Sequence, residues 1–355
     1  MEWKFRKEFQ VMPGIKLKYG KGGIQTEIQS PKETNTDLQL SVEKLKLQLF
    51  KPYEEEHEIK SAPINRLTPE SLQEFKSLLL ASGQSYAETQ QLSTEKTAKH
   101  EQTSKKLDRL NNNLFKFLYK KKRAKLAADL QEVQAEISEL NEQLKLSVVR
   151  LEIDSEDVFG DLYYNLRKAF RLLTQSEKKW DFTSSRATNR YAERTSAAST
   201  ITRSLIDLTE KKLPILETDE PAMCFHNING GDIYLYPGFL IVYESKTEFA
   251  IINYSDLSIS YNAQNFIEEE EVPGDAKVVG HTWHKVNKDG SPDRRFSNNY
   301  QIPIALYGKL QFSSSSGLNE VYCFSNTEFA MLFQKALFDY ADSLKKAESL
   351  LNAFK

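Results

Sequence analysis

Two short segments carry side chains suited to recognising a ligand or a partner, and the first is Asn287–Phe296. Its Asp-Gly and Ser-Pro pairs predict tight turns, and on an extended strand the adjacent Arg294 and Arg295 would point to opposite sides. One guanidinium can pair with Asp289 or Asp293 while the other presents a planar fork to an anion. We consider two interpretations, a hairpin locked internally by Asp293 and Arg295 or a site for a ligand or partner. The candidate residues are Lys288, Asp289, Asp293, Arg294 and Arg295.

The second segment is strongly basic and contains several aromatic residues. Six basic residues and no acidic residue lie between positions 116 and 125, and Phe115, Phe117 and Tyr119 are interspersed with them. At the tip of a helical hairpin they would form a positive surface whose rings can stack or insert. The alternative is that Phe115 and Leu118 pack while the lysines are only solvated. The basic patch consists of Lys116, Lys120, Lys121, Lys122, Arg123 and Lys125.

The sequence offers little for metal or nucleophilic chemistry. On a strand, His281 and His284 would face opposite sides, which argues against shared ligation. Cys224 and His226 would share a face, but no second pair of ligands accompanies them, so we favour core packing. We therefore predict no catalytic residue, no metal and no cofactor. An enzyme with an unfamiliar site around Asp289, Asp293, Arg294 and His284 is kept as a third hypothesis.

A third basic pattern recurs at intervals of four residues. Arg186, Arg190 and Arg194 would form one cationic stripe on a helix. We favour salt bridges from these arginines to neighbouring acids such as Asp181 and Glu193.

The bulk composition gives no global attraction to polyanions. The chain has 355 residues, a formal net charge of −2 and two cysteines, Cys224 and Cys323, which are too few for a disulfide framework. No stretch approaches the roughly 18 apolar residues of a membrane span, and the N-terminus lacks an apolar signal region. We therefore expect a cytoplasmic protein with two or more domains.

A long middle region is predicted to be helical. From Glu70 to Leu213 there is no proline and there are only two glycines. Thr68-Pro69-Glu70 predicts the helix start, with the threonine as the capping residue. A heptad seam runs through Leu126, Leu130, Val133, Ile137, Leu140, Leu144 and Leu151.

The seam needs a partner, and three are considered. The preceding arm, folded back at Asn111–Asn113, would present polar residues such as His100 and Thr103 to it. A later helix carrying Phe159, Leu166 and Phe170 would close a three-helix bundle instead. The remaining alternative is a coiled coil with another chain, which would make the protein a homo-oligomer.

Both ends of the chain read as β-structure. Residues 2–28 predict short hairpins that must pack on another element, and eight strands are predicted between Met223 and Phe324. Ser325 and Glu328 form a capping box before an amphipathic C-terminal helix. The predicted fold is α+β: a small N-terminal β module, a long antiparallel helical or coiled-coil middle, and an antiparallel β barrel closed by the C-terminal helix. The predicted boundaries are 1–30, a linker over 31–67, 68–208, 209–326 and 327–355.

Three parts of the chain resemble known modules. The order of strands and final helix resembles a pleckstrin-homology-like domain. Phe5-Arg6-Lys7-Glu8-Phe9, Pro13-Gly14-Ile15-Lys16-Leu17 and Gly20 to Gly23 are similar to a short bacterial family of unknown function. Gly280–Trp283 and Asn287–Phe296 (NKDGSPDRRF) look like a module attached to varied bacterial proteins. These resemblances imply a bacterial multi-module protein tied to stress or antiphage defence, and they imply no enzymatic activity.

The leading interpretation is a non-catalytic binding and assembly protein, a scaffold or sensor subunit that oligomerises or engages a partner protein. The alternative is a peripheral sensor that binds an anionic membrane or nucleic acid through the basic-aromatic hairpin tip. Pleckstrin-homology-like domains often bind lipid headgroups between their first strands, but Asn227–Gly231 contains no lysine or arginine. Any lipid contact is therefore expected elsewhere.

Overall fold

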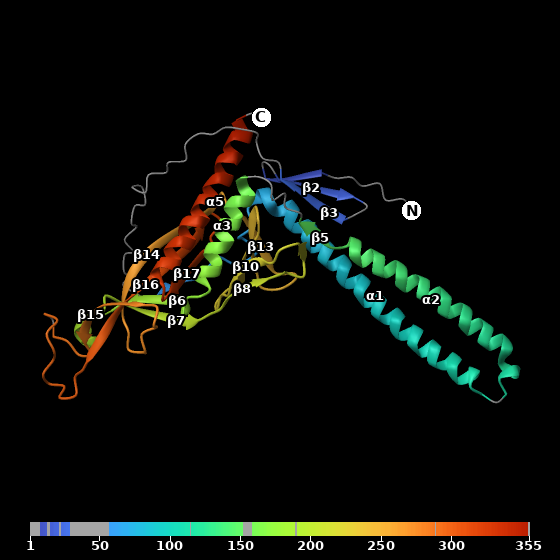
Figure 1. The fold of residues 1–355 in the computed structure, drawn as a ribbon, viewed down its shortest axis with the longest axis horizontal. Helices are drawn as coiled ribbons and strands as arrows, with labels where there is room; N and C mark the ends of the chain where they lie inside the picture. Colours follow the sequence, from blue (N-terminus) through green and yellow to red (C-terminus); the bar gives the residue numbers. More distant parts are fainter. Residues whose placement is uncertain are drawn as a thin grey trace.

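The computed structural model describes residues 8–12, 15–20, 23–28, 57–113, 115–151, 158–188, 190–287 and 289–353. The fold is α+β, as expected: a β-rich body carries two packed helices, and a helical hairpin projects from it (Figure 1). Within the described ranges, no helix combines the length and the apolar character needed to cross a bilayer.

The hairpin consists of α1 (Gln73–Asn111) and α2 (Lys120–Leu146), joined by a short 3-10 turn, η3 (Lys116–Tyr119). It lies in the stretch that lacks proline, because nothing there interrupts the helical hydrogen bonds. The start differs from the prediction. A 3-10 turn, η2 (Glu70–Leu72), precedes α1, and the Thr68 hydroxyl accepts a hydrogen bond from the Ile251 amide at 3.1 Å instead of capping the helix.

The heptad seam packs against the preceding arm, which is the first of the three predicted partners. Val133 and Leu140 are buried and the other seam leucines and Ile137 on α2 are half-buried, while Leu151 belongs to strand β5 (Val149–Leu151). The facing side of α1 is polar. Lys96 pairs with Glu136, and the Ser93 hydroxyl donates to Asn141 Oδ1 at 3.4 Å.

The third helix, α3 (Val158–Leu173), does not join the hairpin, so the three-helix bundle is wrong. It lies on the body beside the C-terminal helix α5 (Thr327–Ala353) in Figure 1. Tyr163 contacts Tyr340 with ring centroids 5.5 Å apart, and Phe170 contacts Phe333 at 6.1 Å, so the two helices are antiparallel. The aromatic side chains of α3 can pack against those of α5 and the sheets, whereas the facing side of α1 is polar and offers them no apolar surface.

Residues 179–205 form strands rather than the expected helix. They comprise β6 (Lys179–Ala187), the short helix α4 (Arg190–Glu193) and β7 (Ser199–Leu205). Trp180 and Phe182 are buried on one face of β6, and β-branched threonines and Ile201 fill β7. Aromatic and β-branched side chains pack well on a pleated sheet surface. This preference for strands outweighs the lack of proline and glycine, which had predicted a helix.

The eight strands predicted after residue 222 are present, but they do not close a barrel. A five-stranded antiparallel sheet has the order β13-β12-β11-β10-β8. A seven-stranded sheet has the order β14-β16-β17-β6-β4, with β15 paired to β16 and β7 paired to β6. Helices α3 and α5 pack against one apolar face of the first sheet, and the start of α1 packs against the other. The first sheet comprises β8 (Leu208–Lys211), β10 (Ala222–Phe225), β11 (Asp232–Leu235), β12 (Phe239–Tyr243) and β13 (Phe249–Asn253). The second adds β4 (His57–Glu58), β14 (Leu257–Ile267), β15 (Lys277–Trp283), β16 (Gln301–Ser314) and β17 (Asn319–Phe324).

Phe225 lies at the centre of the body's core. Its ring contacts Phe170 of α3, Phe312 and Tyr322 of the second sheet, and Phe333 of α5, with centroids 5.2–5.5 Å apart. Aromatic contacts of this kind join both sheets and both helices into one apolar interior.

A third sheet has the strand order β1-β2-β3-β5-β9. The N-terminal strands β1 (Glu8–Met12), β2 (Ile15–Gly20) and β3 (Gly23–Ile28) are antiparallel hairpins, as predicted. They pack on another element through a parallel pairing of β3 with β5, which in turn pairs with β9 (Leu216–Thr218). Phe5-Arg6-Lys7 and the predicted turns at 13–14 and 21–22 lie outside the described residues.

Candidate functional site at the tip of the helical hairpin

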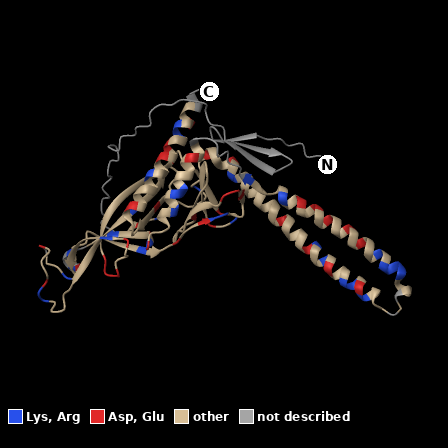
Figure 2. Cartoon of the chain, in the orientation of Figure 1, with Lys and Arg blue, Asp and Glu red and all other residues tan. Residues whose placement is uncertain are grey.

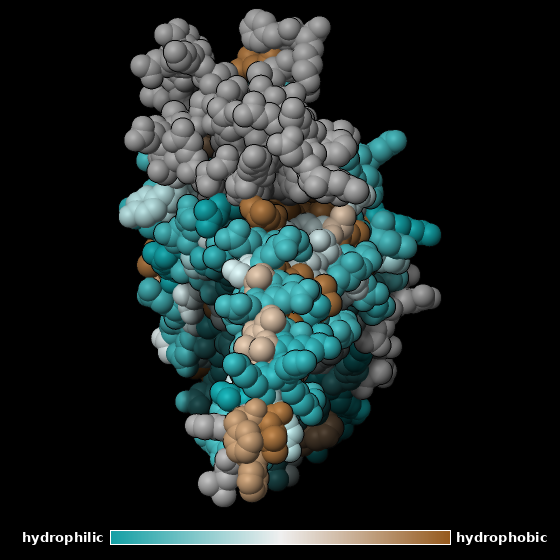
Figure 3. All heavy atoms as spheres, turned by 90° about the vertical axis from the view of Figure 1, so that its right-hand side faces the viewer, coloured by the Kyte–Doolittle hydropathy of each residue, from teal (hydrophilic) through white to brown (hydrophobic). Residues whose placement is uncertain are grey.

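The tip of the hairpin exposes a cluster of large apolar side chains. Phe115, Phe117 and Leu118 are 60%, 70% and 68% exposed, and Tyr119 is 38% exposed. The rings of Phe115 and Phe117 meet edge to face with centroids 6.5 Å apart. Figure 3 shows this apolar cluster at the end of a hairpin whose other visible surface is largely hydrophilic. These side chains do not pack into the hairpin, so the interpretation in which Phe115 and Leu118 pack is wrong.

The tip is shaped by local hydrogen bonds rather than by a core. The Phe115 amide donates to Asn113 Oδ1 at 2.9 Å, and the Leu118 amide donates to the Phe115 carbonyl at 3.0 Å. Arg123 is half-buried and donates from Nε to Asn111 Oδ1. This arginine of the basic patch therefore helps to close the hairpin.

The lysines of the tip are exposed, and no acidic residue lies between positions 109 and 128. Lys120, Lys121, Lys122 and Lys125 are exposed, and they make no ion pair within the part of the chain that the structure describes. In Figure 2 the basic residues, drawn in blue, gather at the tip of the hairpin, whereas the rest of the hairpin carries both basic and acidic residues. The first turn of α2 contains no acidic residue and no side chain caps it, so its amide groups add to the positive potential. The side chain of Lys116 lies outside the described set.

The second predicted site, the loop between β15 and β16, neutralises its own charge. Arg295 donates from Nε to Asp293 Oδ1 at 2.9 Å and from Nη2 to Oδ2 at 2.8 Å, while Arg194 also binds Oδ2. The Asp293 side chain is only 2% exposed. Hydrogen bonds from Arg295 hold the pKa of Asp293 well below its usual range. These contacts correspond to the internally locked hairpin of the first interpretation.

Of the remaining candidate residues in this loop, Asp289 stabilises the turn and Arg294 lies at the surface. Asp289 accepts hydrogen bonds from the amide and the hydroxyl of Ser291 at 3.1 and 2.7 Å, and these bonds lower its pKa. Arg294 is exposed beside a shallow depression of about 440 Å³. Lys288 lies outside the described residues.

The three arginines spaced by four residues do not form a helical stripe, because β6 and α4 place them on different elements. Arg186 binds Glu193 through two hydrogen bonds of 2.8 and 3.1 Å, as predicted. Arg190 donates to the Ala197 carbonyl at 3.3 Å and Arg194 binds Asp293. Asp181, the other predicted partner, instead accepts a hydrogen bond from the Ile228 amide.

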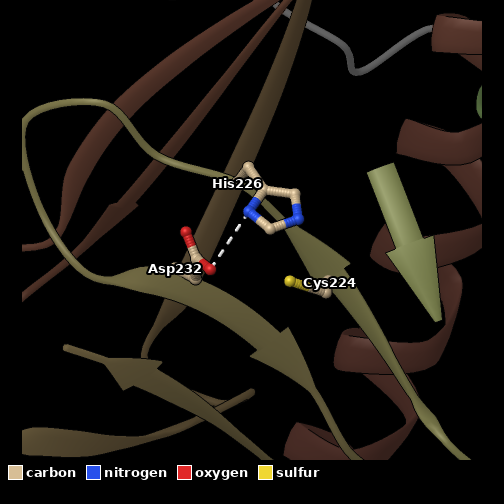
Figure 4. A group of neighbouring side chains, drawn as sticks. All are labelled: Cys224, His226 and Asp232. Atoms are coloured by element: carbon tan, nitrogen blue, oxygen red, sulfur yellow. Dashed lines mark ion pairs between the residues drawn. The ribbon is translucent and has the colours of Figure 1, made fainter. Parts of the chain in front are cut away.

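A cysteine, a histidine and an aspartate come together at the end of β10, with donor atoms within 4.8 Å of one another (Figure 4). His226 Nδ1 lies 3.1 Å from Asp232 Oδ2, and Nε2 lies 3.0 Å from Lys211 Nζ. Both ring nitrogens are thus engaged in a chain from Lys211 to Asp232. Burial raises the pKa of the fully buried Cys224 thiol to about 11, so it stays protonated near neutrality. The sequence did not reveal Asp232, because only strand pairing brings it beside His226.

The chain matches no family model, no curated protein and no solved structure in the comparisons made. The assignment of a site therefore depends on its geometry alone. Among the predicted sites, the hairpin tip combines exposed apolar side chains with uncompensated charge.

Proposed function

We propose that the protein is a non-catalytic binding and assembly protein that attaches to an anionic membrane surface through its hairpin tip. The observation that carries the proposal is the exposed cluster of Phe115, Phe117 and Leu118 beside exposed lysines. The 39 residues of α1 place this cluster about 60 Å from the root of the hairpin. Such a distance lets the tip contact a surface while the body remains free for a partner.

The two kinds of side chain at the tip match the two layers of a lipid surface. Aromatic and leucine side chains gain free energy by entering the boundary between headgroups and acyl chains. Each lysine near an anionic leaflet contributes about 1 kcal/mol, so the four exposed lysines contribute about 4 kcal/mol. Stable attachment needs both contributions, because a single weak anchor gives only reversible contact.

The charge distribution favours a lipid surface over nucleic acid. Single-stranded nucleic acid is bound along a positive groove that follows the phosphate backbone. On the hairpin the excess positive charge is confined to the tip, and farther along lysines pair with acids, as Lys105 does with Glu101 and Lys96 with Glu136. A compact positive end with an apolar cap fits a flat anionic layer.

The body is proposed to recognise a partner protein. Its antiparallel strands and C-terminal helix support the likeness to a pleckstrin-homology-like domain, although the strands do not close a barrel. Because the turn Asn227–Gly231 contains no basic residue, lipid contact is assigned to the hairpin tip instead. A role on the cytoplasmic side of a bacterial membrane, in stress or antiphage defence, is consistent with the sequence resemblances.

Vesicle co-sedimentation tests the proposal. The full chain should bind phosphatidylcholine vesicles only when they contain about 30% phosphatidylglycerol, and binding should fall as salt rises. K121E/K122E should weaken binding more than about tenfold, and F117S/L118S should remove the binding that persists at high salt. The matched control is K105E/K106E, which makes the same charge change on exposed residues of α1.

Equal losses in the tip and control variants would show that net charge, not the tip, drives binding. Binding that K121E/K122E leaves unchanged would refute the proposal. Tight binding to single-stranded DNA in place of vesicles would assign the tip to nucleic acid.

A further inference from the structure

Two acidic side chains are buried side by side in the body without a cationic partner. Asp181 on β6 and Glu320 on β17 are 0% and 1% exposed. Asp181 pairs in register with Tyr322, so it shares a sheet face with Glu320 two residues away. Within the part of the chain that the structure describes, neither carboxyl group lies within ion-pair distance of a lysine, arginine or histidine. Buried acids are normally paired, so this arrangement requires another form of charge compensation.

One oxygen of each carboxyl group binds a neighbouring segment. The first segment, residues 57–64, is here called the strap, and the second is the turn 226–231 between β10 and β11. Glu320 Oε1 accepts hydrogen bonds from the Ser61 amide, at 3.2 Å, and from its hydroxyl. Asp181 Oδ2 accepts one from the Ile228 amide at 2.9 Å. Asn229 links turn to strap by donating to the Ile59 carbonyl at 2.8 Å.

The strap fits closely on the sheet. The Ala62 amide donates to the Gly317 carbonyl at 2.9 Å, and a Cβ atom on Gly317 would lie 2.7 Å from that of Ala62. Gly317 also has a φ of +105°, which other residues rarely adopt. The strap and the turn line part of a pocket of about 690 Å³, to which they contribute Ser61, Asn229 and Gly230. The strap continues through η2 into α1, so it anchors the root of the hairpin.

The second oxygen of each carboxyl group makes no well-formed hydrogen bond. Tyr322 Oη and Asn227 Nδ2, from β17 and the turn, are buried in the same way, although the Asn227 side chain lies close enough to lower the pKa of Glu320. Burial raises the pKa of Asp181, and burial together with the charge of Asp181 raises that of Glu320 to about 7. Two charged groups on the turn side and the strap have their own partners: Asp232 binds His226, and Lys60 pairs with Glu58 at the surface.

We propose that Asp181 and Glu320 form a proton-dependent latch, which holds the strap and the turn on the sheet when the pair carries one proton. When both groups are ionised, two like charges face each other in a medium that screens them poorly, and the strap and turn loosen. The latch is independent of the hairpin tip and of its proposed membrane contact. It would make the pocket and the root of the hairpin sensitive to pH near neutrality.

The direction of the pH effect follows from the raised pKa of Glu320. Between the unfolded value of about 4.5 and about 7, the closed form keeps a proton that the open form releases. The stabilisation is complete at low pH and is lost as the pH rises through 7. The opening constant should therefore increase about tenfold per pH unit between about pH 5 and pH 7, and then level off.

Hydrogen exchange followed by mass spectrometry tests the latch, because the Ser61 and Ile228 amides bind the two carboxyl groups directly. Protection factors, corrected for intrinsic exchange, are measured for peptides covering the strap and the turn from pH 5 to pH 8. In the wild-type chain they should fall by up to about hundredfold over that range. In E320Q they should be high and independent of pH. D181N should keep a weaker pH dependence, because burial alone still raises the pKa of Glu320.

The matched control is E58Q, an exposed strap residue, which should keep the wild-type pH dependence. A flat wild-type profile, or a slope that survives in E320Q, would overturn the latch. Protection that increases with calcium or magnesium and decreases with a chelator would show that a cation, and not a proton, compensates the pair.

Discussion

The hairpin tip and the loop between β15 and β16 both contain basic and aromatic residues, but they differ in how their positive charge is compensated. Each lies at the end of a pair of long antiparallel elements (Figure 1), and each places basic residues beside exposed aromatic rings. In the loop, the buried Asp293 binds Arg295 and Arg194. At the tip, the described residues from 115 to 125 include no acidic side chain.

The difference shows that basic and aromatic residues do not identify a binding surface unless their charge partners are also known. In the loop, charge-assisted hydrogen bonds stabilise one conformation, so most of the attraction for an external anion is already satisfied. At the tip, the lysines repel one another and oppose the helix dipole, and none of them forms an ion pair with another described residue, so an external anion would compensate them. The loop is therefore an ordered structural element, and the tip is suited to contact.

The largest effect is expected where the tip depends on its supporting helices. Leu140 is 8% exposed in the seam between α2 and α1, and truncating such a residue costs about 2–4 kcal/mol. Because the facing side of α1 is polar, L140A should unfold the hairpin before the body. Hydrogen exchange should then increase throughout α1 and α2 while the loop and the core remain protected.

The matched control for this variant is L146A on the same helix, because Leu146 is 46% exposed. It should change the stability of the hairpin by less than about 0.5 kcal/mol. If L140A also loosened the loop, the hairpin and the body would unfold as one unit, and the contrast between the two regions would be lost.

A smaller and more local effect is expected from D293N in the loop. The substitution removes the charge that binds Arg194 and Arg295, so the loop should open and trypsin cleavage after Arg294 and Arg295 should accelerate more than about tenfold. D289N, at an exposed turn position, is the control and should have little effect. Vesicle binding should not change in either variant. A D293N loop that resists trypsin would mean that the ion pairs do not determine its conformation.

Acid should act on the loop in the direction opposite to its action on the latch. The pKa of Asp293 is lowered in the fold, so its stabilisation is present above the unfolded value of about 4 and is lost as the pH falls through the folded value. Glu320 has a raised pKa, so its stabilisation is lost as the pH rises. The presence or absence of an arginine partner accounts for the opposite signs.

Local patterns in the sequence predicted much of the fold. The lack of proline predicted the helical hairpin, and the heptad spacing predicted which face of α2 is buried. Period-two alternation predicted the strands from β10 to β17. Strands β6 and β7 were missed because no glycine or proline marks the turn between them. The open sheets, and α3 on α5, depend on contacts between distant segments, which no local period encodes.

The same limit applies to the sites. The basic tip was predictable because its residues are consecutive, and Asp293 with Arg295 because they are two residues apart. Ser61 and Glu320 are separated by 259 residues, so only the fold brings them together. Asp181 and Asp232 were missed for the same reason, since strand pairing places each beside its partner.

The smallest effect is expected from replacing Arg294, and this replacement tests whether the exposed charge of the loop takes part in membrane contact. Arg294 is exposed and its neighbour Arg295 binds Asp293, so R294A should change the free energy of unfolding by less than about 0.5 kcal/mol, whereas R295A should open the loop. Thermal unfolding and trypsin cleavage measure both variants. Vesicle binding by R294A should equal that of the wild type, because the attraction resides in the tip. A clear loss of binding in R294A would place part of the contact surface on the loop, because the variant removes a charge that the fold does not use.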